Sequence, residues 1–275
     1  MQNKLVAKIQ TLNDIHSWDV GGSLLQSVFK VEKLKPQRVA TFGEVTAKHG
    51  FHVETLGDCQ SHWARKATMR LDESPREFFQ SFHWRRVKVA KSQGTVTFPS
   101  DNLKGTRLSG GLFFESQFKK EIDWIGIFSI WCSILTPYGA ILHPAIDMEQ
   151  PVRNGRDVRE YTLNEEINQN AWSRFSTGTF HCEFRAGELN SLFSGFTNLG
   201  WASFFGGEYA HEVAAAAISA AGFPVQSIGD GYLVQVTEDI NDVINDFTMF
   251  LKLRAELKSL FRDGLFLIKD EPTII

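Results

Sequence analysis

The sequence has few cysteines and lacks the segments that identify secreted and membrane proteins. It contains three cysteines, Cys59, Cys132 and Cys182, among 275 residues. An odd number at wide spacing excludes a disulfide framework and is typical of a reducing compartment. The first residues, Met1 to Val6, lack the apolar core of a signal peptide, and no apolar run reaches the roughly 18 residues of a membrane-spanning helix. We therefore expect a cytoplasmic protein without a membrane partner.

Recognisable catalytic motifs are also absent from the sequence. There is no G-x-S-x-G elbow, Walker A loop, G-x-G-x-x-G turn after a strand or H-E-x-x-H helix. A cysteine enzyme needs a thiol of lowered pKa, which the apolar surroundings of Cys132 do not favour, and only Cys59 stays open as a nucleophile. The acidic pairs at 165–166 and 270–271 lie in polar stretches and are interpreted as solvated charges. We predict that the protein is not an enzyme.

One pattern fits metal chemistry. His49, His52, Cys59 and His62 have the spacing H-x2-H-x6-C-x2-H, and four nitrogen and sulfur ligands match tetrahedral zinc. The six-residue spacer is short for a zinc module, and the pairs lack tight glycine turns, so structural or surface histidines are favoured. No cofactor is predicted. The alternative hypothesis is a metal-dependent hydrolase that uses these four residues.

The net charge of −3 conceals two halves of opposite sign. Residues 1–110 contain 17 basic and 10 acidic side chains, whereas residues 111–275 contain 12 and 22. Either the halves attract each other, or the acidic half presents a surface to a basic partner. The densest basic run, Trp84 to Lys91, alternates charged and apolar residues, which favours a solvated strand face over a nucleic-acid patch. We predict no nucleic-acid partner.

The order of patterns predicts an α+β fold with mixed or antiparallel sheets packed by helices. Residues 116–135 have helical periodicity, and their strongest part, 122–135, is apolar nearly all round, which predicts a central buried helix. A similar order of elements on both sides of 144–160 suggests two related α+β halves. We expect a single compact unit over 1–275, with a potential subdivision into 1–143 and 161–275 joined by the linker 144–160.

Other elements follow from local signals. In the first half we expect two short helices within residues 1–30, strands at 38–42, 62–71, 94–98 and 138–143, and a loop at 100–111. In the second half we expect a strand at 179–185, helices at 189–196 and 208–221, a hairpin of 225–228 with 233–236, and a last helix between 239 and 264.

The segment from Leu199 to Glu212 combines glycines with large aromatic residues. Its aromatic side chains either pack as a corner of the core, which is favoured, or form an exposed anchor for a partner, since Trp and Tyr are frequent binding hot spots. In the second case the candidate partner-binding residues are Trp201, Phe204, Phe205, Glu208, Tyr209 and Glu212.

Residues 110–270 carry a resemblance to a known group of proteins. It rests on Phe113-Phe114-Glu115, on Pro137-Tyr138-Gly139, on Gly200 to Gly206, and on the run Gly229 to Asp239 before a terminal helix. These features resemble the immunity proteins of bacterial polymorphic-toxin and type VI secretion systems, nearest to immunity-protein family 52 and related families. The resemblance implies a cytoplasmic protein that binds and neutralises a cognate toxin from the adjacent gene by occluding its active site or substrate surface. It transfers no site residue and leaves open whether the chain forms a homo-oligomer.

Overall fold

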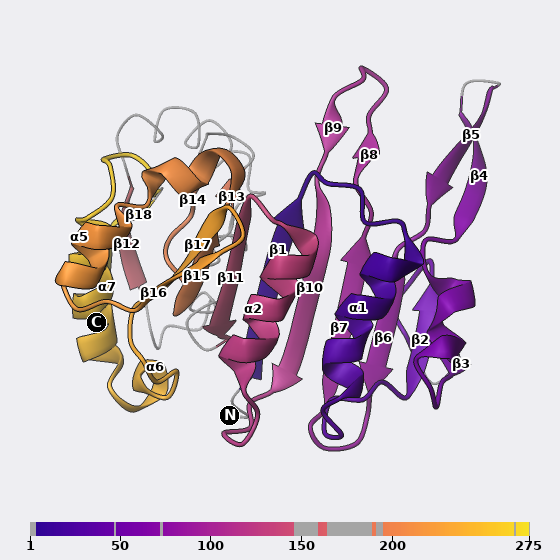
Figure 1. Cartoon of the computed structure of the whole chain (residues 1–275), viewed down its shortest axis with the longest axis horizontal. Helices are drawn as coiled ribbons and strands as arrows, with labels where there is room; N and C mark the ends of the chain where they lie inside the picture. The colour runs from indigo at the N-terminus through magenta and orange to yellow at the C-terminus, as the bar shows by residue number, and fades with distance from the viewer. Residues whose placement is uncertain are drawn as a thin grey trace. The chain divides into compact units, whose positions relative to one another are not determined.

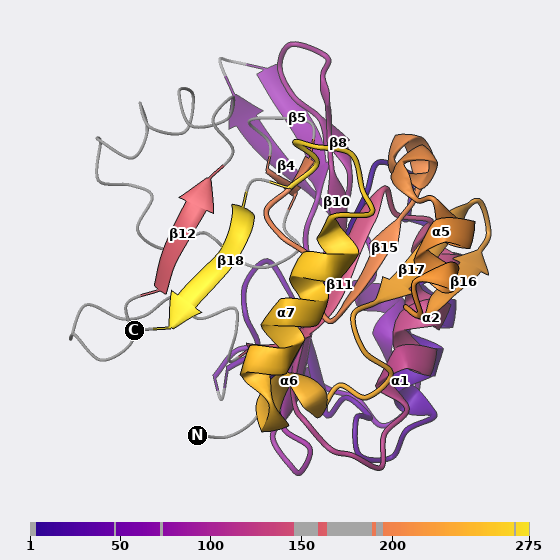
Figure 2. The same ribbon diagram turned by 90° about the vertical axis from the view of Figure 1, so that its left-hand side faces the viewer.

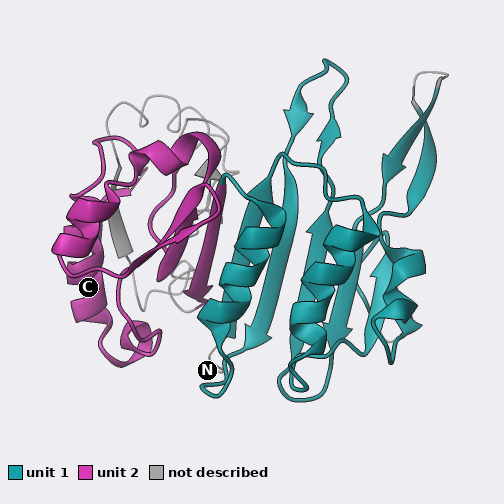
Figure 3. Ribbon diagram, viewed as in Figure 1, with its two compact units in different colours: residues 1–138 teal, residues 139–275 magenta. Residues whose placement is uncertain are grey.

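The computed structural model describes residues 4–46, 48–71, 74–145, 159–163, 189–190, 195–266 and 268–274. It divides the chain into two compact units, residues 1–138 and 139–275 (Figure 3). Each unit combines antiparallel strands with helices, so the predicted α+β class is confirmed. Most of the predicted linker, residues 146–158, lies outside the described residues.

Unit 1 contains a sheet in the order β1-β10-β7-β6-β2-β3, and its described pairings are antiparallel (Figure 1). Two separate hairpins, β4–β5 and β8–β9, project from one end of this sheet. The strands are β1 (Lys4–Thr11), β2 (Arg38–Thr41), β3 (Phe51–His52), β4 (Lys66–Leu71), β5 (Ser74–Phe79), β6 (Phe82–Arg86), β7 (Ser92–Thr97), β8 (Ser100–Asp101), β9 (Arg107–Leu108) and β10 (Gly110–Gln117). The helices are α1 (Trp18–Phe29), the 3-10 helix Gly57–His62 and α2 (Trp124–Leu135).

Helices α1 and α2 cover one face of this sheet (Figure 1). The oxygens of Ser17 and Asp123 accept hydrogen bonds from the first turns of α1 and α2, which fixes where each helix begins. Between the helices, the indole N–H of Trp131 donates to Oγ of Ser27 at 2.7 Å. Trp131 also packs edge to face on Phe114 of β10. Buried and less buried residues alternate along β6, β7 and β10, so this sheet has one buried face and one more polar face.

A glycine makes room for one of the buried tryptophans of this core. Trp84 of β6, Gly94 of β7 and Phe114 of β10 are consecutive partners across three strands. A Cβ at Gly94 would lie 2.1 Å from Cζ2 of Trp84, so the indole occupies the space of the missing side chain. The two aromatic rings flank the glycine with centroids 6.2 Å apart.

Four predictions for unit 1 need correction. The first expected helix is strand β1, because the four-residue spacing of Leu5 and Ile9 fits a strand as well as a helix. The predicted strand 62–71 begins only at Lys66, after a 3-10 turn. Helix α2 begins at Trp124, since the residues up to Gln117 belong to β10, and its buried face is incomplete because Ile130 is 47% exposed. Within the predicted loop 100–111, β8 and β9 form a hairpin.

The polar face of this sheet contains a histidine whose titration couples to folding. His83 of β6 is half-buried, with Nδ1 3.0 Å from Oγ1 of Thr95. Burial lowers the pKa of His83; Glu44 opposes this shift and His49 adds to it. A lowered pKa stabilises the fold above the unfolded value of about 6.5. We therefore expect the free energy of unfolding to fall as the pH drops from about 6.5 through the folded pKa of His83.

Urea unfolding at pH 7.5 and 5.5 measures this effect. The free energy of unfolding should differ less between the two pH values for His83→Gln than for the natural chain, and an equal difference would contradict this role of His83.

Unit 2 contains a sheet in the order β16-β17-β15-β11, also antiparallel in its described pairings. A second pair, β12 with β18, lies beside α7 (Figure 2). The strands are β11 (Gly139–Pro144), β12 (Arg159–Leu163), β13 (Leu189–Asn190), β14 (Gly195–Phe196), β15 (Ala202–Phe205), β16 (Val225–Ile228), β17 (Gly231–Gln235) and β18 (Ile268–Ile274). The helices are the 3-10 helix Gly207–Glu212, α5 (Ala215–Ala220), α6 (Asp242–Asn245) and α7 (Phe247–Lys258).

The hairpin of unit 2 follows the sequence prediction, whereas its helices are shorter than predicted. Strands β16 and β17 are joined by Gly229 and Asp230, and Gly229 takes the positive φ of 61° that a two-residue turn favours. The predicted helix 208–221 is divided into a 3-10 helix and α5. The last helix is divided at Asp246, which caps α7 by accepting from the N–H of Met249. The predicted helix 189–196 contains β13 and β14 instead, and the predicted strand 179–185 lies outside the described residues.

Candidate functional site

The structure does not bring the candidate zinc ligands together. His49, His52, Cys59 and His62 all belong to the described residues, which contain no group of three or more His, Cys, Asp or Glu side chains suited to a metal ion. His49 Nε2 lies 3.3 Å from the Thr41 carbonyl oxygen, and the ring of His62 stacks on another aromatic ring. In the described residues these four side chains therefore do not form a group that could hold a metal ion.

Cys59 is also unsuited to act as a nucleophile. Its side chain is fully buried in the 3-10 helix Gly57–His62. Burial raises the pKa of the Cys59 thiol to about 12, and the neighbouring carboxylate of Asp58 adds to the shift. The thiol is therefore protonated at neutral pH, whereas the nucleophilic form of cysteine is the thiolate.

The basic run from Trp84 to Lys91 is only partly solvated. The guanidinium of Arg86 is buried and donates to the carbonyl oxygens of Lys35, at 3.0 Å, and Val89, at 3.3 Å. Arg85 is exposed and donates to the carbonyl oxygen of Val45 at 3.1 Å. Arg86 therefore ties loops together inside unit 1, which corrects its interpretation as a solvated charge.

The aromatic residues of the predicted partner-binding set form part of the core of unit 2. Trp201 is 3% exposed, and Phe204, Phe205 and Tyr209 are buried as well. Around the buried Phe196, the rings of Phe205 and Tyr209 each pack edge to face with centroids 5.0 Å away. These four side chains are thus a packed corner of the fold, not an exposed anchor.

Trp201 also connects three segments by hydrogen bonds. Its backbone N–H donates to Nδ1 of His143 on β11 at 2.7 Å. Its indole N–H donates to Oγ1 of Thr237 at 3.1 Å, and that hydroxyl donates to the carbonyl oxygen of Asp239. Trp201 thereby connects β11, the start of β15 and the segment after β17.

The remaining predicted residues, Glu208 and Glu212, differ in their surroundings. Glu208 is exposed, and Glu212 is half-buried and accepts from Nε of Arg262 at 2.6 Å. Among the side chains of unit 2 that the structure describes, the exposed cations are Lys252, Arg262 and Lys269. The exposed carboxylates are Glu208, Asp230, Glu238, Asp239, Asp246, Glu256, Asp263 and Asp270. We call these eight residues, which come from several elements and connecting segments of unit 2, the acidic surface.

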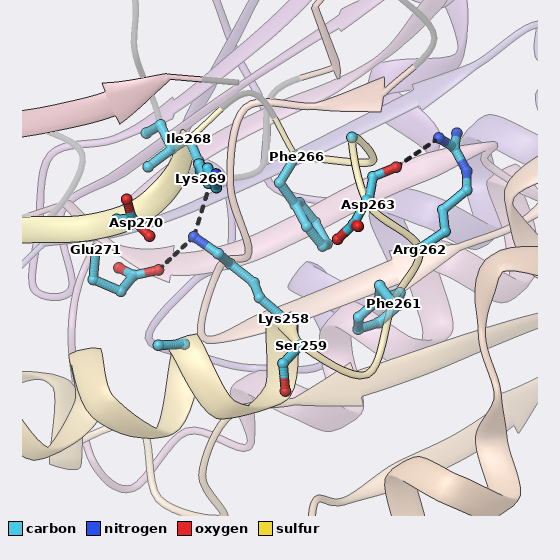
Figure 4. A pocket seen from close by; sticks show the side chains of 12 residues that line it. Lys258, Ser259, Phe261, Arg262, Asp263, Phe266, Ile268, Lys269, Asp270 and Glu271 are labelled. Carbon is cyan, nitrogen blue, oxygen red and sulfur yellow. Dashed lines mark hydrogen bonds and ion pairs between the residues drawn. The ribbon is translucent and has the colours of Figure 1, made fainter. Parts of the chain in front are cut away.

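A cavity of about 660 Å³ opens at the carboxyl end of α7 (Figure 4). Ala255, Lys258 and Ser259 contribute the end of the helix to its wall. Buried aromatic and aliphatic side chains form the apolar part, and two members of the acidic surface lie at its sides. These further lining residues are Phe261, Arg262, Asp263, Gly264, Phe266, Ile268, Lys269, Asp270 and Glu271. The volume is in the range of ligand sites in proteins.

A buried cluster of three charges supports the cavity wall. Glu271 of β18 accepts from Nε of Arg254 at 2.7 Å and from Nζ of Lys258 at 2.8 Å. The three side chains are only 10%, 2% and 7% exposed, respectively. Lys258 also donates to the carbonyl oxygen of Ile268 at 2.9 Å. Burial lowers the pKa of Lys258, and the Glu271 carboxylate opposes this shift. The cluster attaches β18 to α7.

Sequence reasoning missed this cluster, because Asp270-Glu271 was interpreted as a solvated pair. Asp270 is exposed as predicted, but Glu271 is not. A signal was available in α7: Phe250, Arg254 and Lys258 are four residues apart, so the two cations lie on the apolar stripe of the helix. Cations on a buried stripe require a buried acid, although the pattern does not say which one. Glu165 and Glu166 lie outside the described residues.

Comparison with known proteins gives a likeness among the solved structures. No family profile and no curated protein sequence matches the chain. A solved structure described as Pseudomonas aeruginosa T6SS protein PA0821 is similar, with a TM-score of 0.56 and 11% sequence identity. The likeness covers 96% of this chain and 77% of the other, and at this identity it shows the fold alone. The resemblance to immunity-protein family 52 stays a prediction. Across the described residues, no helix has the length and apolar character needed to cross a membrane.

Proposed function

We propose that this chain is a type VI secretion immunity protein that binds a cognate toxin and blocks it. The observation that carries the proposal is the charge on the exposed part of unit 2, where the described side chains include eight exposed carboxylates and three exposed cations. A surface with one dominant sign steers a partner of the opposite sign and fixes its orientation. The partner we infer is therefore a basic toxin, such as a nuclease that carries a positive substrate groove.

Two further points support this function. The fold is similar to that of a protein described as a T6SS protein, which agrees with the resemblance to type VI immunity proteins in residues 110–270. The candidate metal ligands of the alternative, a zinc-dependent hydrolase, are not gathered in space. We therefore favour protein binding over hydrolysis, and we propose a cytoplasmic site of action, where an immunity protein meets its toxin.

The experiment is co-expression with the product of the adjacent open reading frame, combined with binding kinetics of the two purified proteins. The natural chain should rescue growth and form a tight one-to-one complex. The variant Glu208→Gln, Asp230→Asn, Glu238→Gln should associate on the order of tenfold more slowly, because these charges steer encounter. Failure of the natural chain to rescue growth or to bind would contradict the proposal.

A matched control is available in unit 1. Glu32, Glu44 and Glu54 are exposed, and their replacement by Gln changes the net charge by the same amount. This control variant should associate at the rate of the natural chain. If both variants slow association equally, net charge acts without a specific surface, and the acidic surface of unit 2 is not the binding site.

A further inference from the structure

Some charged side chains that line the cavity at the end of α7 take part in hydrogen bonds and ion pairs, and others do not. Lys258 is bound to Glu271 and to the Ile268 carbonyl oxygen, and Arg262 is bound to Glu212. Within the described part of the chain, the carboxylates of Asp263 and Asp270 have no hydrogen bond or ion pair, and the charge of Asp270 acts on Lys258 only through space, opposing the lowering of its pKa by burial. Lys269 adds one exposed positive charge against these two negative ones. The six charged side chains that line the cavity sum to zero, but those outside hydrogen bonds and ion pairs are two carboxylates and one ammonium, so the groups left for a partner favour a cation.

The helix end adds to this preference. The cavity is lined by Ala255, Lys258 and Ser259, at the carboxyl end of the twelve-residue helix α7. The aligned peptide dipoles place a partial negative charge at that end, which favours a cation nearby. Lys258 meets part of this preference from inside the wall, where its charge is shared with Glu271.

The apolar wall suits the stem of a long side chain. Phe261 and Phe266 line the cavity and pack edge to face, with ring centroids 5.4 Å apart. Arginine and lysine bury their aliphatic stems against such surfaces while the charged end reaches a polar group. In Figure 4 the side chains of Asp263 and Asp270 are well separated, with Phe266 and Lys258 between them, so they would meet two different cationic groups.

We propose that this cavity is an anchor pocket for a basic peptide segment of a protein partner, with one arginine or lysine side chain at Asp263 and another at Asp270. The partner's identity rests on the proposed function, whereas the chemistry rests on the cavity alone. Arginine is the stronger fit, because its guanidinium donates two parallel hydrogen bonds to one carboxylate. The pocket would fix the register of a partner that the acidic surface attracts from a distance.

The test uses isothermal titration of the full chain with acetylated Arg-Ala-Arg amide. We expect measurable binding, and loss of binding when citrulline replaces both arginines, since citrulline keeps the shape and removes the charge. The double variant Asp263→Asn, Asp270→Asn should bind the arginine peptide about tenfold more weakly. No binding by the natural chain, or equal binding of the two peptides, would overturn the proposal.

A matched double variant separates the pocket from general attraction. Glu32→Gln with Glu54→Gln removes two exposed carboxylates of unit 1 that neither line the cavity nor belong to the acidic surface. It should bind the arginine peptide as the natural chain does, and an equal loss in both double variants would overturn the pocket. Because the titration needs no toxin, its failure leaves growth rescue by the natural chain as a separate measure of the proposed function.

Discussion

Replacing Glu271 by Ala should destabilise unit 2 by about 3–5 kcal/mol, the range for removing one partner of a buried ion pair. The carboxylate is the shared acceptor of Arg254 and Lys258, both almost fully buried. Its removal leaves two desolvated cations facing one another. The conservative change Glu271→Gln keeps the size and one acceptor oxygen, so we expect an intermediate loss.

Hydrogen exchange at increasing urea concentrations measures the free energy of opening at each backbone amide. The free energy of opening should fall for amides in α7 and β18, because Glu271 joins these two elements. The neighbouring variant Asp270→Asn removes an exposed charge from the same strand and should change stability by no more than about 0.5 kcal/mol. A Glu271→Ala protein as stable as the natural chain would show that the cluster does not hold β18 to α7.

Replacing Trp201 by Ala should cost about 3–5 kcal/mol, as expected for a large aromatic side chain removed from a core. The indole is buried and hydrogen-bonded to Thr237, so the variant loses packing and leaves a hydroxyl without its donor. Urea unfolding followed by hydrogen exchange should locate the loss in residues 139–275. The control is Met249→Ala, because Met249 is 47% exposed in the same unit and should change stability by about 0.5 kcal/mol or less.

The same variant decides between the two interpretations of the aromatic segment. If Trp201→Ala kept its stability and lost toxin binding, Trp201 would be an exposed anchor and its buried position would be wrong. We expect the opposite order of effects: stability falls, and binding falls only as the folded fraction does. Phe205, which is fully buried against Phe196 and Phe261, should behave in the same way.

Local signals predicted the parts of the fold that local chemistry determines. The hairpin β16–β17 was predictable because Gly229 and Asp230 form its turn without help from distant residues. The beginning of α7 was not predictable, since Asp246 interrupts an apolar stripe that continues on both sides. The helix also ends at Lys258, earlier than the sequence predicted. The spacing of Leu5 and Ile9 predicted a helix where the structure has strand β1, because a spacing of four residues fits both a helix and a strand. Pairing with β10 is what makes this segment a strand.

The candidate site was less predictable, since it depends on contacts between distant residues. The excess of acid in the second half was visible in the sequence, but not which carboxylates are exposed and which is buried. Glu271 lies next to Asp270 in the chain and differs from it completely in surroundings. Only the pairing of β18 and the position of α7 separate these two neighbours, and no periodic pattern connects residue 271 to residues 254 and 258.

The buried charge cluster and the acidic surface respond differently to ionic strength. Salt screens exposed charges over about 10 Å at 0.1 M, whereas a desolvated cluster such as Arg254, Lys258 and Glu271 is screened much less. A rise in salt concentration should therefore weaken the attraction of a basic partner and leave β18 attached to α7. A basic toxin of the kind proposed would then be released by salt while β18 keeps its contact with α7.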